Sequence, residues 1–230
     1  MVRRSVVVIA KLEDAAVGPI GGKAEGLARM IELGLPVPPA IVVPVGADVG
    51  DVVSIARELG EPLAVRSSAA GEDTRERSAA GQYETILGVR TAELPEAIAR
   101  VRASTSRARA YGGGNEVAVV VQRQVDATKS GVAFSRDPLT GDAVYIVECA
   151  FGGGERVVSG EVTPDRFRID GERITARVFG QLRTLRDDEL RKLVALVARA
   201  DAGFGYPVDV EFCFERRQLW LVQCRPITTT

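Results

Sequence analysis

The sequence of 230 residues contains no histidine. Histidine is the side chain that most often changes its charge near neutral pH, and it commonly serves as a general base or a metal ligand. This chain therefore cannot supply a histidine base, a histidine metal ligand or a phosphohistidine. Any general base, metal ligand or phosphate carrier in this chain must be another kind of side chain.

Cysteine is scarce, with Cys149, Cys213 and Cys224 as the only three. Their number is odd and no two have the Cys-x-x-Cys spacing, so the sequence indicates neither a disulfide framework nor a zinc knuckle. All three lie in apolar segments with strand character. We expect them to be unreactive core residues.

An excess of charge of one sign is also absent, since 30 Lys and Arg residues balance 31 Asp and Glu residues to a net charge of -1. This balance gives no bulk attraction to nucleic acid or to an anionic membrane, and any anion site must be local. Apolar runs such as Val117–Val121 are far shorter than a membrane span, and Val6–Ile9 is too short for a signal peptide. We expect no membrane or nucleic-acid partner and a cytoplasmic location.

The chain is long enough to bury a core, since 46% of its residues are hydrophobic. Its length suits one large domain or two small lobes. The best candidate for a boundary is the run Gly112–Gly114. We therefore predict an N-terminal lobe of residues 1–111 and a C-terminal lobe of residues 112–230.

Hydrophobic periodicity predicts a mixture of strands and helices. The expected strands are Val6–Ile9, Ala40–Val43, Leu63–Ser68, Thr85–Val89, Val117–Val121, Gly131–Ser135, Ala143–Cys149, Arg166–Ile169 and Arg173–Ala176. The expected helices are one that opens at the loop before Lys23 and ends at Gly34, and those over Asp51–Leu59, Leu94–Tyr111 and Asp187–Ala202.

Two runs with alternating polar and apolar residues near the C-terminus predict a hairpin, Val208–Glu215 followed by Leu219–Pro226. A two-residue turn at Arg216 and Arg217 would favour Asn-Gly, so we expect a three-residue loop, Arg216–Gln218. That loop pairs Glu211 with Gln223 and Asp209 with Arg225.

This register divides the hairpin into two faces. The apolar face would carry Val210, Phe212, Phe214, Trp220, Val222 and Cys224. The polar face would carry two carboxylates, an amide and a guanidinium, which suit Mg²⁺ and phosphate oxygens. Taken alone, the hairpin's composition is more typical of an edge hairpin with a solvated charged face.

A glycine-rich loop, Gly18–Lys23, comes directly before the first expected helix. The first N–H groups of a helix lack partners within the helix and attract anions, and Lys23 would add a full positive charge. The loop does not match the Walker A pattern, and a plain tight turn explains it as well.

Arg66 lies near the end of an otherwise apolar strand. A buried guanidinium needs an acidic or phosphate partner, which makes Arg66 a candidate site residue. The following segment, residues 67–85, is rich in small and polar residues and could cover a ligand, with Gly81 allowing close approach of the backbone. An ordinary surface loop would have the same composition.

Five separated stretches, in order, resemble the N-terminal nucleotide-binding domain of the pyruvate phosphate dikinase and phosphoenolpyruvate synthase family, to which rifampicin phosphotransferase also belongs. They are Gly21-Gly-Lys-Ala-Glu-Gly-Leu with Leu35-Pro-Val-Pro-Pro, Val65-Arg-Ser-Ser with Ala80-Gly-Gln-Tyr-Glu-Thr, Val119-Val-Val-Gln-Arg, Gly131-Val-Ala-Phe-Ser-Arg-Asp-Pro with Val158-Ser-Gly-Glu-Val-Thr-Pro-Asp, and Asp209-Val-Glu with Gln223-Cys-Arg-Pro. The resemblance covers Gly18 to Pro226.

The resemblance implies an α+β protein with an ATP-grasp fold, in which two lobes with antiparallel sheets hold ATP between them. It implies roles for individual residues: Lys23 and Arg66 as triphosphate ligands, Gly81 and Thr85 in a loop over the phosphates, Gln122 on the adenine side, Glu211 and Gln223 as magnesium ligands, and Arg225 as a phosphate-binding arginine. Asp209 joins the metal set through the hairpin register, and Arg66 and Arg225 are the candidate catalytic residues.

The chain also departs from the family pattern. Ser78-Ala-Ala-Gly-Gln replaces a usual Ser-Phe-Ala-Gly-Gln, and Phe151-Gly-Gly-Gly-Glu replaces a usual Gly-Leu-Gly-Glu. Only Ile227-Thr-Thr-Thr follows Pro226, where the family has a histidine-bearing swivelling domain.

The resemblance therefore implies a domain or subunit that cleaves Mg-ATP and passes a phosphoryl group to a histidine on another domain or chain. Two alternatives stay open: a stand-alone ATP-grasp kinase or ligase that acts on a small molecule, and a nucleotide-sensing module without catalysis. The final acceptor is not encoded in these residues.

Overall fold

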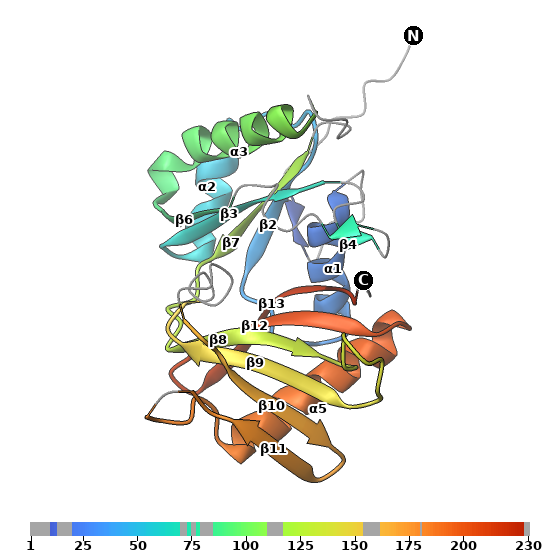
Figure 1. Ribbon diagram of the computed structural model, residues 1–230. Helices are drawn as coiled ribbons and strands as arrows, with labels where there is room; N and C mark the ends of the chain where they lie inside the picture. Colours follow the sequence, from blue (N-terminus) through green and yellow to red (C-terminus); the bar gives the residue numbers. More distant parts are fainter. Residues whose placement is uncertain are drawn as a thin grey trace. The chain divides into compact units, whose positions relative to one another are not determined.

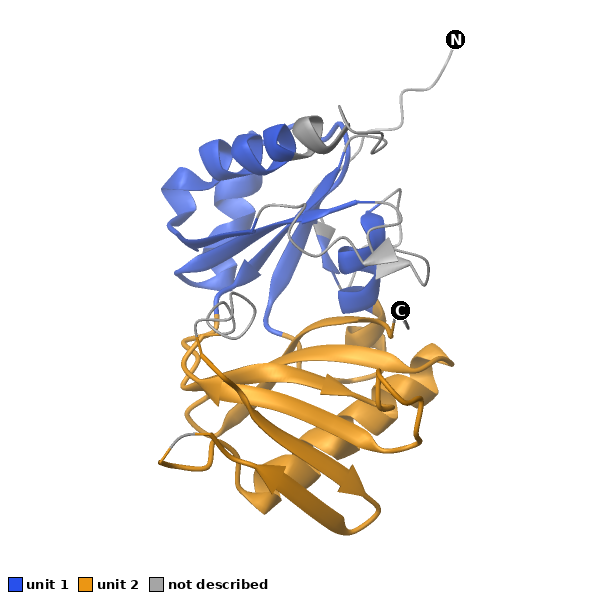
Figure 2. Ribbon diagram, in the orientation of Figure 1, with its two compact units in different colours: residues 1–28, 38–124 blue, residues 29–37, 125–230 orange. Residues whose placement is uncertain are grey.

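The computed structural model describes residues 10–12, 20–69, 73–74, 77–78, 85–109, 117–153, 162–179 and 181–227. The chain forms two compact units, which Figure 2 shows in two colours. Unit 1 comprises residues 1–28 and 38–124, and unit 2 comprises residues 29–37 and 125–230.

Unit 1 contains a five-stranded sheet in the order β1-β2-β7-β3-β6, and all its ladders are antiparallel (Figure 1). Its strands are β1 (Ala10–Lys11), β2 (Ala40–Val43), β3 (Leu63–Ser68), β6 (Thr85–Val89) and β7 (Ala118–Arg123), and β4 (Asp73–Thr74) pairs separately with β5 (Arg77–Ser78). Its helices are the first part of α1 (Gly21–Glu32), α2 (Val52–Ala56), η2 (Arg57–Leu59), η3 (Thr91–Glu93) and α3 (Leu94–Arg109).

The core of unit 1 lies between one face of this sheet and the helices α2 and α3. The buried cluster joins strand residues such as Ile41, Val65 and Val121 to helix residues such as Val52 and Ile98. Strand β7 is central, and Val119, Val120 and Val121 are all 0% exposed, as a continuous apolar run predicts for a strand covered on both faces.

The position of β7 also explains where the two units divide. This strand follows the glycine run at 112–114, so the predicted boundary placed it in the C-terminal lobe. In the structure β7 pairs with β2 and β3, and unit 1 continues to Gln124. The division therefore falls after β7 and not before it.

Unit 2 contains a six-stranded antiparallel sheet in the order β11-β10-β9-β8-β12-β13. Its strands are β8 (Lys129–Phe134), β9 (Tyr145–Phe151), β10 (Asp165–Asp170), β11 (Arg173–Arg177), β12 (Val208–Glu215) and β13 (Gln218–Pro226). Helix α5 (Asp187–Phe204) packs on one face, where Leu190, Leu193, Val197 and Ala200 are buried (Figure 1). The opposite face of the sheet carries the polar residues described below.

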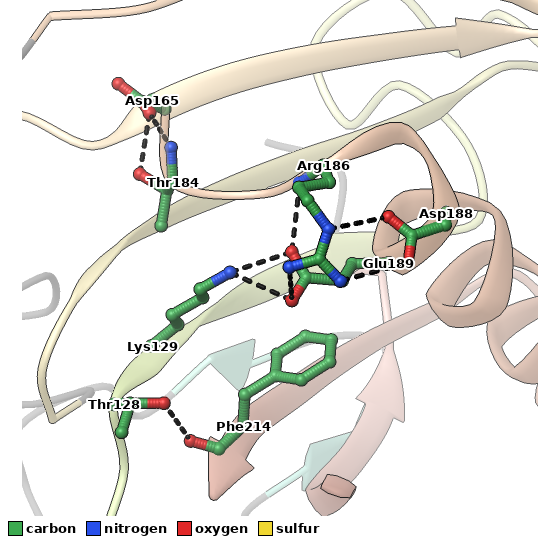
Figure 3. A network of polar contacts seen from close by, with 8 residues as sticks. All are labelled: Thr128, Lys129, Asp165, Thr184, Arg186, Asp188, Glu189 and Phe214. Carbon is green, nitrogen blue, oxygen red and sulfur yellow. Dashed lines mark hydrogen bonds and ion pairs between the residues drawn. The ribbon is translucent and has the colours of Figure 1, made fainter. Parts of the chain in front are cut away.

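Helix α5 is held to its sheet by a partly buried ion pair (Figure 3). The Lys129 Nζ of β8 donates to the Glu189 Oε1 at 2.9 Å and to Oε2 at 2.7 Å. Glu189 also accepts a hydrogen bond from the backbone N–H of Arg186, just before the helix, at 2.9 Å. One carboxylate therefore caps the helix start and anchors it to the strand.

The C-terminal hairpin forms where it was expected, but its turn differs from the prediction. Glu215 pairs with Gln218, so the turn has two residues, and the three-residue loop was wrong. Arg216 adopts a positive φ of 56°, the conformation that made two arginines look unsuitable there. The tight turn places Leu219 and Leu221, and not Trp220, opposite Phe214 and Phe212 on the buried face.

A β-bulge then restores the predicted pairs further along the hairpin. The register shifts between Glu211 and Phe212, which leaves Val222 as an extra residue in β13. Beyond the bulge, Glu211 pairs with Gln223 and Asp209 pairs with Arg225, as predicted. Compared with the prediction, the turn has one residue fewer and β13 has one residue more before Gln223. The two differences therefore cancel.

Among the described residues, no helix is both long enough and apolar enough to cross a membrane.

Candidate functional site

The polar face of the β12–β13 hairpin brings four predicted site residues together. In an antiparallel pair, directly opposed residues lie on the same face, and their Cβ atoms are about 5 Å apart. Glu211 opposes Gln223, and the Asp209 and Arg225 pair lies on the same face two positions further along. The side chains that sequence analysis grouped are therefore neighbours in the fold.

Asp209 and Arg225 form an ion pair within this group. The Nε of Arg225 donates to the Oδ2 of Asp209 at 2.8 Å. The Asp209 side chain is 9% exposed and that of Arg225 is 28% exposed. Gln223 is buried and Glu211 is half-buried. The site thus contains a largely buried charge pair beside a buried amide and a half-buried carboxylate.

The same face continues across the sheet. Strand β8 places Val132 opposite Glu211 and Phe134 opposite Asp209, both half-buried. On β9, Glu148 opposes Val132, and its carboxylate lies 3.7 Å from the Nε of Arg166 on β10. Sequence analysis missed Glu148, although a charged residue inside the apolar run 146–150 is the same signal that drew attention to Arg66.

Lys23 lies in the first turn of α1, and the end of β3 fixes that turn. The Ser68 hydroxyl donates to the carbonyl oxygen of Ile20 at 2.7 Å and accepts from the N–H of Ala24 at 3.0 Å. The N–H of Gly22 donates to the carbonyl of Ala69 at 3.0 Å. Gly21 has φ +77°, and a Cβ there would lie 2.2 Å from the Ser68 carbonyl oxygen. The glycine is required because the two segments meet so closely.

Arg66 and Thr85 lie on one face of the unit 1 sheet. Arg66 of β3 opposes Thr85 of β6 and Val120 of β7, so the three side chains share a row. Ser68, two residues beyond Arg66, points to the same face, so the loop that carries Lys23 adjoins this side of β3. The structure therefore places Lys23 and Arg66 on two segments that are directly hydrogen-bonded to each other.

Gln122 shares that face, since it opposes Ala64 of β3 and Ala40 of β2. Its side chain is 2% exposed, and its Nε2 lies 3.5 Å from the carbonyl oxygen of Pro38. The amide of Gln122 is thus packed into unit 1. Gly81, the proposed closing point of the phosphate loop, lies outside the described residues.

The hairpin offers Mg²⁺ a small set of oxygen donors. In the part of the chain that the structure describes, no group of three or more His, Cys, Asp or Glu side chains is arranged to hold a metal ion. Glu211 and Gln223 offer two oxygen donors on one face. Mg²⁺ is commonly held by one or two protein ligands and completes its shell with water and phosphate oxygens, so this pair fits the ion.

A second polar cluster lies under the opposite face of unit 2 and is structural. The Oδ2 of Asp165 accepts from the backbone N–H of Thr184 at 2.8 Å and from its hydroxyl at 2.6 Å. Cys149 opposes Asp165 and is fully buried. Burial, with a smaller contribution from the Asp165 charge, raises the pKa of Cys149 to about 12. This thiol stays protonated and cannot act as a nucleophile near neutral pH.

Comparisons with known proteins identify the family. The family described as "Pyruvate phosphate dikinase, AMP/ATP-binding domain" matches residues 48–182 and 174–230. The chain belongs to this family. Its resemblance to the nucleotide-binding domain of pyruvate phosphate dikinase and phosphoenolpyruvate synthase is confirmed, and so is its character as an ATP-binding domain.

Curated relatives carry several names within the family. The chain is 32% identical to the prodigiosin synthesizing transferase PigC of Serratia marcescens over 91% of its own length and 32% of that protein. It is 37% identical to a probable phosphoenolpyruvate synthase of Archaeoglobus fulgidus, over 73% of this chain and 27% of that protein. It is 38% identical to a rifampicin phosphotransferase of Streptomyces, over 72% and 23% respectively. The chain spans only about a third or less of these three proteins.

Solved structures of ATP-grasp enzymes share the fold. D-alanine-D-alanine ligase from Helicobacter pylori matches with a TM-score of 0.53 at 12% identity, over 92% of this chain and 55% of that one. The ADP complex of N5-carboxyaminoimidazole ribonucleotide synthetase matches with the same TM-score of 0.53 at 12% identity, over 86% of this chain and 42% of that one. The predicted α+β, ATP-grasp fold class is confirmed.

Proposed function

We propose that this chain binds Mg-ATP and passes a phosphoryl group to a histidine on a separate domain or partner chain. The observation that carries this proposal is the polar face of β12–β13, where Glu211 opposes Gln223 and Arg225 lies on the same side. The family has an AMP/ATP-binding domain, which supports ATP as the nucleotide. The polar face carries oxygen donors for a metal ion and the Arg225 guanidinium for phosphate oxygens.

Glu211 and Gln223 are the proposed magnesium ligands. When bound, Mg²⁺ would neutralise part of the polyphosphate charge. Glu211 is half-buried, so solvent reaches part of this residue. Lys23, Arg66 and Arg225 are the proposed phosphate ligands, with Arg66 and Arg225 stabilising the charge that develops during transfer.

The remaining predicted residues have supporting roles in this proposal. Thr85 directly opposes Arg66, so a phosphate held by that arginine would lie near the start of β6. Gly81 belongs to the segment that precedes β6 and would approach the phosphates through its backbone. Gln122 would contribute to the adenine side, and because its amide is buried, it would do so mainly through the shape and backbone of β7.

The absence of histidine requires the acceptor to come from elsewhere. An imidazole nitrogen would attack the β-phosphorus of ATP, and the bond from that phosphorus to the oxygen bridging it to the α-phosphate would break. That oxygen would keep the electron pair and leave on AMP. The γ-phosphoryl would have to pass to water or phosphate for the products to balance.

A labelling experiment tests the proposal. The chain is incubated with Mg²⁺, ATP labelled in the β-phosphate and candidate histidine-bearing partner proteins. We expect label on the partner that is lost in acid and stable in base, together with AMP. This chain should carry no such label, and the Glu211→Ala variant should transfer none.

Three outcomes would count against a histidine relay. If no partner is labelled and no AMP forms, the relay is excluded. If the chain alone phosphorylates a small molecule, it is a direct ATP-grasp kinase or ligase. If ATP binds tightly to both the wild type and the Glu211→Ala variant without turnover, the chain is a nucleotide sensor.

We also propose that the chain acts in the cytoplasm, where ATP is abundant. None of the three cysteines, all of which lie among the described residues, forms a disulfide bond, which suits a reducing compartment.

A further inference from the structure

The ion pair between Asp209 and Arg225 gives these two residues distinct roles at the proposed phosphate site. The contact is made through the Nε of the guanidinium, at 2.8 Å from one carboxylate oxygen. A contact at Nε restrains rotation about the end of the side chain. It therefore sets the direction in which the two terminal nitrogens of the guanidinium point.

The surroundings of Asp209 make this contact strong. Its side chain is 9% exposed, and on the same face of the sheet it lies between Arg225 of β13 and Phe134 of β8. A carboxylate that is removed from water needs a charged partner, and an apolar neighbour reduces the screening of that partner's charge. Arg225 holds the Oδ2 of Asp209, and the Oδ1 is buried from solvent, so a metal ion could reach this carboxylate only if its side chain moved.

Glu211 differs from Asp209 in its exposure and in the residue that opposes it on β13. It is half-buried, and it opposes the amide of Gln223, which carries no charge. The two acidic residues of β12 share a face but are two positions apart, which is about 7 Å along a strand. The hairpin thus presents a half-buried carboxylate opposite a neutral amide, and a buried carboxylate that is paired with an arginine.

We propose that Asp209 is a positioning residue that orients Arg225 toward the polyphosphate, and that it is not a ligand of the metal. This inference rests on the proposed function, in which Arg225 binds phosphate. It replaces the expectation that Asp209, Glu211 and Gln223 all bind Mg²⁺. The metal set is reduced to Glu211 and Gln223, with water and phosphate oxygens completing the shell.

Calorimetric titration of nucleotide at a series of Mg²⁺ concentrations tests this assignment. The variants are Asp209→Asn, Arg225→Gln, the double variant and Glu211→Gln. We expect Asp209→Asn to weaken ATP binding roughly tenfold, the effect of losing one charge-assisted hydrogen bond. The Mg²⁺ concentration for half-maximal binding should stay unchanged in Asp209→Asn and rise in Glu211→Gln.

Two further readouts distinguish orientation from general stability. The losses in Asp209→Asn and Arg225→Gln should not add in the double variant, because both remove the same function. AMP, which lacks the β- and γ-phosphates, should bind the wild type and Asp209→Asn equally. As a matched control, Asp142→Asn removes a carboxylate that pairs with Arg168 at 3.4 Å in the same unit, and it should leave ATP binding unchanged.

The inference is overturned if Asp209→Asn raises the Mg²⁺ requirement as Glu211→Gln does, if the two losses add fully, or if Asp209→Asn binds ATP like the wild type. The double variant removes both charges together and so avoids an unpaired buried charge if a single variant does not fold. Failure of the wild type to bind ATP would instead reject the proposed function.

Discussion

At the scale of single residues, the contact between the start of α1 and the end of β3 is the most demanding feature of unit 1. Gly21 adopts φ +77°, where side chains are strained, and it faces the Ser68 backbone without space for a Cβ. Ser68 holds the helix start from both sides, through Ile20 and Ala24. The position of Lys23 therefore depends on two neighbours that bear no charge.

We predict that Gly21→Ala destabilises the protein by more than about 1 kcal/mol, because it adds a steric clash to the cost of a positive φ. Gly46→Ala is the matched control, since Gly46 has φ +73° and nothing within 4 Å of a built Cβ. Urea unfolding of both variants measures the difference. Equal losses for the two variants would show that the approach of Ser68 is not limiting.

The cysteines should differ in reactivity. Cys213 is half-buried, whereas Cys149 and Cys224 are buried. Because the thiolate is the reactive form, Cys149 with a pKa of about 12 would be ionised in only about one molecule in 10⁴ at pH 8. We predict that a thiol reagent modifies Cys213 first in the folded protein, and that Cys149 reacts only after unfolding or at much higher pH.

Mass spectrometry after brief labelling identifies the modified residue. Cys213→Ser should abolish the early reaction, and Cys224→Ser should leave it unchanged. Early labelling at Cys149 would contradict the burial described here.

At the scale of secondary-structure elements, the C-terminal hairpin contains a strained turn. Among the described residues, Arg216 is the only one other than glycine with a positive φ. Glycine is preferred at the first central position of a two-residue turn in which that position alone has a positive φ.

We predict that Arg216→Gly stabilises the protein by about 0.5–1 kcal/mol, whereas Arg217→Gly gives no such gain. Thermal unfolding of the two variants compares them directly, and a gain from Arg217→Gly of the same size would exclude relief of strain at residue 216.

The elements show how far the sequence could predict the fold. The bounds of β2, β3 and β6 were predicted correctly because short apolar runs lie between turn residues there. The predicted strand Val6–Ile9 lies outside the described residues. The hairpin turn was wrong because local propensity disfavours two arginines, but burial of Leu219 and Leu221 outweighs that preference.

The sequence predicted which residues of the site pair across the hairpin, but not the contacts that they make. The pairing of Glu211 with Gln223 was predicted through a loop that does not exist, and a bulge at Val222 made it correct. The ion pair of Asp209 with Arg225 was not predicted, because alternation assigns residues to a face without defining their hydrogen bonds. The position of β7 was also missed, since its pairing with distant strands leaves no local trace in the sequence.

At the scale of the whole molecule, the chain has the ATP-grasp fold and no histidine, and it spans only about a third or less of the three relatives described above. Each unit has its own antiparallel sheet, and each sheet carries some of the proposed nucleotide ligands on one face. Loss of residues from either sheet should therefore affect nucleotide binding.

We predict that Mg-ATP raises the unfolding temperature of the whole chain. A ligand that binds only the folded protein adds about 2.7 kcal/mol of stability when present at a hundred times its dissociation constant. AMP should protect less than ATP, and Glu211→Ala should remove the part of the protection that depends on Mg²⁺. Differential scanning fluorimetry with each nucleotide, with and without chelator, measures this. Protection by AMP equal to that by ATP would argue against polyphosphate contacts.

The extra residue at Val222 has a consequence for how this hairpin tolerates insertions and deletions. Deletion of Val222 alone would join Leu221 directly to Gln223, so the ladder would run without an irregularity and Glu211 would still lie beside Gln223. Insertion of a residue between two paired positions of β13 would instead need a second bulge to keep both the apolar contacts near the turn and the polar pairs. Homologues should therefore lose this extra residue more readily than they gain another.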